Sequence, residues 1–186
     1  MNAQKITPCL WFDMEAEEAM NFYVDTFNGA PNSDKQSLPG EPVKNSKIVS
    51  IGYYPENSEI EHLKGMNGKV LNGRFELAGQ QFICLDGGPI FKFNESISLT
   101  IDCKDQEELD YFWSKLSSVP ESEQCGWCKD KYGLSWQIIP KRLGELMMDP
   151  DKQSLPGGKE KVGRVMEAFM KMHKIDVAEL EKAYNG

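Results

Sequence analysis

The sequence contains little histidine, no excess of basic residues and no long apolar run. Its 186 residues include 2 histidines, and 21 Lys and Arg stand against 29 Asp and Glu, which gives a net charge of −8. Binding to a nucleic-acid backbone is not expected, because no basic excess exists to displace counterions. No apolar run approaches ~18 residues, so no membrane partner or span is expected. The first residues lack the apolar core of a signal peptide, which predicts a cytoplasmic protein.

The cysteines argue against a disulfide framework. There are 5 of them, an odd number at scattered spacing: Cys9, Cys84, Cys103, Cys125 and Cys128. A small secreted scaffold has an even and denser set. Cys125 and Cys128 form one C-x-x-C pair within a predicted strand, where positions i and i+3 point to opposite faces. We therefore favour a structural role for this pair over a redox or zinc site.

The first half of the chain predicts a strand, a helix and three further strands. Residues 5–12 (KITPCLWF) form an extended apolar run, and apolar residues then recur at helical spacing from 16 to 27. Asp13 is placed to cap this helix. The later elements are strands at 47–54, 69–77 and 80–86, with loops at 31–46 and 55–67. This half therefore reads as one strand–helix–strands module.

The second half repeats that element order. Residues 96–102 (SISLTID) alternate in polarity like a strand, and Asp105 and Glu108 have the spacing of a capping box before a helical stripe. Residues 124–140 then predict a hairpin that turns at 130–133. The repeated order predicts an α+β fold of two modules, at about 5–87 and 95–140.

The last predicted strand separates polar from apolar side chains. Ser135, Gln137 and Ile139 share one face, and Trp136 and Ile138 share the other, which suits packing under helices. If the sheet is curved into a cup, Gln137 lies inside it. A solvated face of a one-sided sheet would show the same alternation.

The tail after this strand predicts helices. Residues 162–173 form an amphipathic helix whose apolar, Met-containing face could pack on its own core or on a second subunit. Asp176 and Glu179 have the spacing that caps a final helix. The tail is therefore expected to be a helical extension that covers 143–186.

Three stretches resemble the PhnB-like family of the glyoxalase/bleomycin-resistance (vicinal oxygen chelate) superfamily. They are KITPCLWFDMEAEEAMNFYVDTF, FICLDGGPIFKFNESISLTIDC and QCGWCKDKYGLSWQIIP, and the resemblance extends into the tail. It implies paired βαβββ modules whose curved sheets form cups, in a single domain over 1–142, and a homodimer. Some relatives carry the label 3-demethylubiquinone-9 3-methyltransferase. A methyl donor usually needs a Gly-rich turn from strand to helix, whereas Gly87-Gly88 runs into Pro89.

The resemblance also locates the positions at which metal-dependent relatives bind their ion. In this sequence they hold Pro8, Cys84, Ser96 and Gln137. Proline has no side-chain donor and serine is a poor ligand, so we expect no metal and no other cofactor. Neither histidine lies on a predicted cup strand, because His62 falls in the acidic loop and His173 in the tail.

Seven residues are candidates for contact with a small-molecule ligand, and the catalytic residues remain open. The candidates are Cys84, Asp86, Ser96, Ser98, Gln137, Trp11 and Phe91. Cys84 and Asp86 are expected to face the cup, although for Cys84 we favour the role of a small semi-buried residue. The two aromatics could line the mouth of the cup or belong to the core.

Two functions fit these residues. The first is metal-free binding of a small polar molecule in the cup. The second is an enzyme of the lyase, transferase or oxidoreductase type, which would use Cys84, Asp86 or Gln137 on a small carbonyl or ring substrate.

Overall fold

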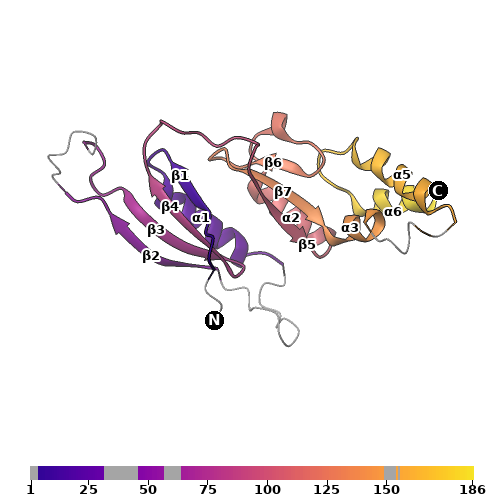
Figure 1. The fold of residues 1–186 in the computed structure, drawn as a ribbon, viewed down its shortest axis with the longest axis horizontal. Coiled ribbons are helices and arrows are strands. Elements are labelled where there is room, and N and C mark those ends of the chain that lie inside the picture. The colour runs from indigo at the N-terminus through magenta and orange to yellow at the C-terminus, as the bar shows by residue number, and fades with distance from the viewer. Residues whose placement is uncertain (1–3, 32–45, 57–63, 149–153, 155) are drawn as a thin grey trace. The chain divides into compact units, whose positions relative to one another are not determined.

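The computed structural model describes residues 4–31, 46–56, 64–148, 154 and 156–186. The chain divides into two compact units, Met1–Phe93 and Asn94–Gly186, and each has its own sheet and its own helix against it (Figure 1). The two predicted modules fall one in each unit, which confirms the α+β class. Most of the loop expected at 31–46, and His62, lie outside the described residues.

The first unit has the predicted βαβββ order. Its elements are β1 (Cys9–Phe12), α1 (Ala16–Asn28), β2 (Lys47–Tyr53), β3 (Val70–Leu77) and β4 (Gln80–Asp86). The strand order is β1-β4-β3-β2, with β1 parallel to β4 and the other neighbours antiparallel. The first strand therefore crosses over through α1 to reach the far edge of the sheet.

Helix α1 packs closely on the middle of this sheet. Met20 and Tyr23 are fully buried, and the Tyr23 ring stacks on Phe75 of β3 at 6.4 Å between centroids. A Cβ on Gly73 would lie 2.7 Å from both the Cys84 Sγ and the Met20 Sδ, which is closer than real Cβ contacts come. The lack of a side chain at Gly73 therefore allows the helix to approach the sheet.

The start of α1 differs from the prediction. The N-cap residue is Glu15, which makes no side-chain capping bond. Instead, the Asp86 Oδ1 accepts a hydrogen bond from the Ala16 amide at 2.8 Å, and its Oδ2 accepts one from the Val70 amide at 2.9 Å. The predicted cap at Asp13 is wrong, because a carboxylate 70 residues away takes the first helical N–H.

The second unit repeats the order with three strands. Its elements are β5 (Ser98–Cys103), α2 (Gln106–Leu116), a short 3₁₀ helix (Pro120–Ser122), β6 (Trp127–Lys129) and β7 (Ser135–Pro140). The strand order is β5-β7-β6, with β5 parallel and β6 antiparallel to β7. Helix α2 begins as predicted, because the Asp105 Oδ1 accepts from the Glu108 amide at 3.0 Å.

The tail forms three described helices, which are α3 (Lys141–Met147), α5 (Gly158–Phe169) and α6 (Val177–Asn185). Val165 of α5, Leu146 of α3 and Leu180 of α6 are buried where the three helices pack together. The chain itself thus covers Val165, whereas Met166 of the same helix is 43% exposed. Asp176 caps α6 as predicted, with its Oδ1 accepting from the Glu179 amide at 3.1 Å.

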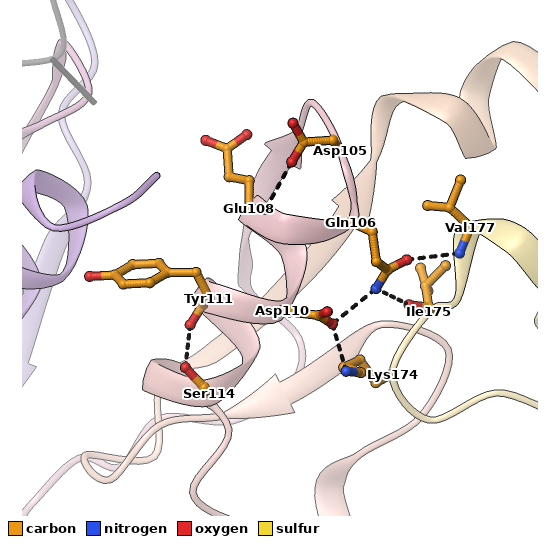
Figure 2. Close-up of polar contacts among 9 residues, drawn as sticks. All are labelled: Asp105, Gln106, Glu108, Asp110, Tyr111, Ser114, Lys174, Ile175 and Val177. Carbon is orange, nitrogen blue, oxygen red and sulfur yellow. Dashed lines mark hydrogen bonds and ion pairs between the residues drawn. The ribbon is translucent and has the colours of Figure 1, made fainter. Parts of the chain in front are cut away.

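A polar junction joins the tail to α2 (Figure 2). The Gln106 side chain accepts from the Val177 amide at 2.9 Å and donates to the Ile175 carbonyl at 3.2 Å. It also donates to Asp110, which accepts from the Lys174 ammonium at 2.6 Å. The tail segment 170–177 is therefore held at residues 174–177 by side chains from the first two turns of α2.

Backbone hydrogen bonds hold the same segment beside the start of β6. The Cys125 amide donates to the Met172 carbonyl, and the Gly126 amide donates to the His173 carbonyl, both at 2.8 Å. These bonds satisfy amides that would otherwise lie at an open sheet edge. No helix within the described residues has the length and apolarity needed to cross a membrane.

Candidate functional site

The second sheet has one face under α2 and one face that carries polar side chains. Trp136 and Ile138 of β7 are 2% and 0% exposed on the helix side. Strand alternation places Gln137 on the other face, and the register sets Thr100 of β5 and Trp127 of β6 beside it. The predicted assignment of faces along β7 is confirmed.

A direct contact joins two of the predicted ligand-binding residues. The Gln137 Nε2 donates a hydrogen bond to the Ser98 Oγ at 2.8 Å, and both side chains are half-buried. Ser96 does not join them, because β5 begins only at Ser98 and the exposed Ser96 hydroxyl donates to Asn94. The structure therefore assembles Ser98 and Gln137 and leaves Ser96 outside.

A buried carboxylate fixes the position of Gln137 along the sheet. Asp130 is fully buried in the β6–β7 turn, where its Oδ1 accepts from the Tyr132 and Leu134 amides at 2.9 and 3.0 Å. Its Oδ2 accepts from the Trp136 indole N–H at 2.8 Å. A slip of one residue would break these bonds and exchange the two faces of β7, so the register is strongly specified.

Two further residues lie on the polar face: Ser135, which was predicted to share that face with Gln137 but was not among the seven candidates, and Lys129, which was not predicted there. Ser135 is 1% exposed, and within the described residues its Oγ has no hydrogen-bond partner. Lys129 of β6 pairs with Ser135 in register and forms an ion pair with Glu95. The hydrogen bond from Lys129 is the main reason that the pKa of Glu95 lies below its usual value. Counting back across the predicted turn at 130–133 pairs Lys129 with Leu134 and so places it on the Trp136 face, whereas the observed pairing with Ser135 places it on the face of Gln137.

Cys84 and Asp86 lie on the helix-covered face of the first sheet. Cys84 is 0% exposed, and burial, with a smaller effect from the Asp86 charge, raises the pKa of its thiol to about 12. Asp86 is equally buried and bonded to two backbone amides. The prediction that both residues face an open cup is wrong, because they share a strand face with Phe82, which stacks on Phe75 in the core. A buried neutral thiol is also poorly suited to be a nucleophile.

Trp11 and Phe91 are brought together in the first unit. Their ring centroids lie 4.9 Å apart in an edge-to-face arrangement, and Phe91 is 62% exposed. The Trp11 indole N–H donates to the Gly88 carbonyl at 2.8 Å, and a Cβ on Gly87 would lie 2.1 Å from the Trp11 ring. The Gly87-Gly88 pair therefore makes room for the indole.

The four positions at which the resemblance places a metal ion each have another role within their own unit. The Pro8 carbonyl accepts from the Ile83 amide at 2.9 Å, and Cys84 is buried beneath α1. Ser96 is bonded to Asn94, and Gln137 to Ser98. Across the described ranges, no group of three or more His, Cys, Asp or Glu side chains could hold an ion. These residues do not fit a metal-binding role.

Comparison with known proteins identifies the family. The model of the 3-demethylubiquinone-9 3-methyltransferase family matches residues 4–42 and 40–139, and it stops short of the tail. A PhnB protein from Bacillus cereus, whose name assigns it provisionally to the same methyltransferases, is 37% identical over 74% of this chain and 99% of its own, with a TM-score of 0.55. Protein PA1353 from Pseudomonas aeruginosa shares the fold at 15% identity, over 74% of this chain and 98% of its own, with a TM-score of 0.50. No curated protein matches the sequence.

The family model covers both sheets and their two helices, and the match to the Bacillus cereus protein covers 74% of this chain. They support a glyoxalase-like protein, and the methyltransferase label belongs to the relatives that carry it. The chain therefore belongs to the PhnB-like family.

Proposed function

We propose that the protein binds a small polar molecule on the open face of β5, β6 and β7 without using a metal ion. The observation that carries the proposal is the hydrogen bond between Gln137 and Ser98, at 2.8 Å. It orients the Gln137 amide so that its Oε1 is left to accept, and the Ser98 hydroxyl can still donate its proton. Trp127 lies beside Gln137 in register and adds an aromatic surface of the kind that lines small-molecule sites.

The test uses a thermal-shift panel of metabolites and metals, followed by affinity measurements on two variants. Gln137→Leu keeps the approximate size of the side chain and removes its donor and acceptor. Affinity for a compound found in the panel should fall by ~1–3 kcal/mol while the melting temperature changes little. Trp136→Ala removes a large core side chain on the other face, so it should cost ~3–5 kcal/mol of stability.

Two outcomes would contradict the proposal. If Gln137→Leu binds the compound as well as the parent protein does, the polar face is only a solvated sheet surface. If Gln137→Leu unfolds the protein while Trp136→Ala mainly weakens binding, the two faces of β7 are assigned the wrong way round.

The alternative function is an enzyme that acts on a small carbonyl or ring substrate. It is favoured by the methyltransferase name of the matching family model and of the Bacillus cereus protein. Of the three side chains considered for chemistry, Cys84 and Asp86 are buried under α1, and Gln137 is the one on an open face. Turnover of a panel compound, or stabilisation that requires a metal, would favour the enzyme over the binding protein.

We also propose a homodimer and a cytoplasmic location. The open face of the first sheet carries Trp11, Ile83 and Leu85, so a second copy would bury apolar area there. Sedimentation should then give a mass of about twice 21.1 kDa. A single 21.1 kDa species at micromolar concentration would refute the dimer.

The proposed cytoplasmic location is supported by the five cysteines, which are all free thiols.

A further inference from the structure

We infer that the molecule bound on this face carries a carboxylate, held by Lys129, Ser135 and Ser98, next to a flat ring that lies on Trp127. The inference rests on the proposed function and adds the chemical class of the ligand. It depends on residues other than Gln137, so the two can be tested separately.

The register places the three proposed carboxylate-binding residues in one row across the sheet. Ser98 of β5 pairs with Ser135 of β7, and Ser135 pairs with Lys129 of β6. Neighbouring strands lie about 4.8 Å apart, and paired residues project to the same face. A carboxylate has two oxygens and about four acceptor positions, so it can reach more than one member of such a row.

Each residue in the row has a hydrogen to donate. The Ser98 Oγ already accepts from Gln137, so its own proton is available to a further acceptor. The Ser135 Oγ is buried without a partner among the described residues, and buried hydroxyls normally find one. Lys129 contributes the only positive charge of the three strands, and its side chain is 21% exposed. A row of donors with one cation is complementary to an anionic acceptor.

Two carboxylates of the protein, Glu95 and Asp102, could disfavour an anion bound beside Lys129, and they do so to different extents. Glu95 already pairs with Lys129, but its side chain is 62% exposed, and an exposed ion pair of this kind is weak enough to be exchanged. Asp102 shares the open face two rows further along β5, roughly 13 Å from Ser98, where salt screens its charge. Glu95 should therefore compete with a bound anion without excluding it.

The next row of residues on this face would contact the flat ring of the ligand. It consists of Thr100, Gln137 and Trp127, so an apolar indole lies one row away from the donors. A molecule that spans both rows needs a charged end and a flat body. Benzoate is the smallest probe with both features, and benzamide has the same shape without the charge.

The experiment titrates benzoate and benzamide into the full-length protein and follows backbone amide shifts by NMR. Benzoate should bind weakly, as expected for a fragment, and about tenfold more tightly than benzamide. Lys129→Met should weaken benzoate binding about tenfold, and Ser135→Ala about fivefold without lowering the melting temperature. Glu95→Gln should tighten binding about threefold, because it removes the competing carboxylate. The matched control is Lys131→Met, which removes the same charge from the turn and should leave the affinity unchanged.

The outcomes separate the inference from the proposed function. The inference is overturned if benzoate fails to bind, if benzamide binds as well as benzoate, or if Lys129→Met and Lys131→Met behave alike. If, at the same time, a neutral compound binds in a way that depends on Gln137, the proposed function stands and only the ligand class is wrong. Tighter binding by Glu95→Gln is the result that a purely structural role for Lys129 would not produce.

Discussion

The two units have the same order of elements, but their buried aspartates act over different ranges of the chain. In the first unit Asp86 accepts from the amides of Ala16 and Val70, which lie 70 and 16 residues away in sequence. In the second unit Asp130 accepts from Tyr132, Leu134 and Trp136, all within six residues. One carboxylate thus ties distant strands and a helix together, and the other organises a single turn.

The helix starts show the same difference. Helix α2 is capped by Asp105, the residue directly before it, whereas α1 has no capping side chain of its own and relies on Asp86 from β4. In the second unit the ends of elements are specified by nearby residues. In the first unit they are specified only once the sheet has formed.

The largest expected effect follows from the long-range aspartate. Asp86→Ala should lower the free energy of unfolding of the first unit by about 3–5 kcal/mol, because it leaves the Ala16 and Val70 amides buried and unpaired. Hydrogen exchange should show faster exchange in α1 and β3, measured unit by unit. Asp130→Ala should act in the same way on β6 and β7 in the second unit.

Asp13→Ala is the matched control for that prediction. Asp13 lies close to the same helix start, but Asp86 supplies the carboxylate that bonds the first amide, so stability should change by less than about 0.5 kcal/mol. Equal losses for Asp13→Ala and Asp86→Ala would mean that α1 is capped locally after all, and the contrast between the units would disappear.

The next effect concerns the tail, which belongs to the second unit alone. Gln106→Ala removes hydrogen bonds to Ile175 and Val177, so the amides of 174–177 should exchange faster and global stability should fall by about 1–3 kcal/mol. Gln124→Ala, which removes one bond to the exposed Met170 carbonyl and one to the neighbouring Cys125 sulfur, a weak acceptor, should have a smaller effect. A result in the reverse order would show that the junction of Figure 2 does not hold the tail.

The same junction should depend on pH. The hydrogen bond from Lys174 is the main cause that lowers the pKa of Asp110. A depressed carboxyl pKa stabilises the folded state above the ordinary value and loses that contribution as the pH falls through the lowered one. Attachment of the tail should therefore weaken below about pH 4, and Asp110→Asn should remove this dependence.

The features that the sequence could predict are those specified by nearby residues, and most of them lie in the second unit. The faces of β7 were predictable because its alternation is clean and a tight turn fixes the register beside it. The caps at Asp105 and Asp176 were predictable because each bonds an amide three residues ahead. In β4 the apolar residues occupy both faces, as Phe82 and Ile83 show, so periodicity could not orient Cys84 and Asp86. Their orientation depends on partners far away in the chain, which no local pattern reveals.

The polar face of the second sheet was predictable only where alternation within a single strand was enough to assign a residue to it. Gln137 and Ser98 could be assigned to one face from alternation within their own strands, but the contact between them needed the parallel register of β5 and β7. Lys129 was missed because its face depends on the pairing across the hairpin, and Ser135, although assigned to the face of Gln137, was not among the candidates because its burial does not show in the sequence. An unpartnered buried hydroxyl is a property of packing, which sequence alone does not show.

The smallest expected effect is on the labelling rates of two buried thiols, one in each unit, which allow the two units to be compared. Cys84 stands two residues before Asp86, and Cys128 two residues before Asp130, and burial, with help from the neighbouring aspartate, raises the pKa of both thiols to about 12. At pH 8.5 the thiolate fraction of each should be lower than in the unfolded chain by a factor on the order of a thousand. Iodoacetamide should thus label the exposed Cys9 first and reach the two buried thiols only when their units open. Mass spectrometry gives the labelling rate at each site.

Labelling also tests whether the two units open separately, because Cys84 reports on the first and Cys128 on the second. Since Asp86 holds only residues of the first unit, Asp86→Ala should speed the labelling of Cys84 and leave Cys128 nearly unchanged. Asp130→Ala should do the reverse. Raising the pH from 9 toward 12 should speed labelling in both units, because a raised thiol pKa stabilises the folded state below the ordinary value and this contribution is lost as the pH approaches the raised one. If each substitution instead accelerates both thiols equally, the units open as one, and the long-range aspartate supports the whole chain.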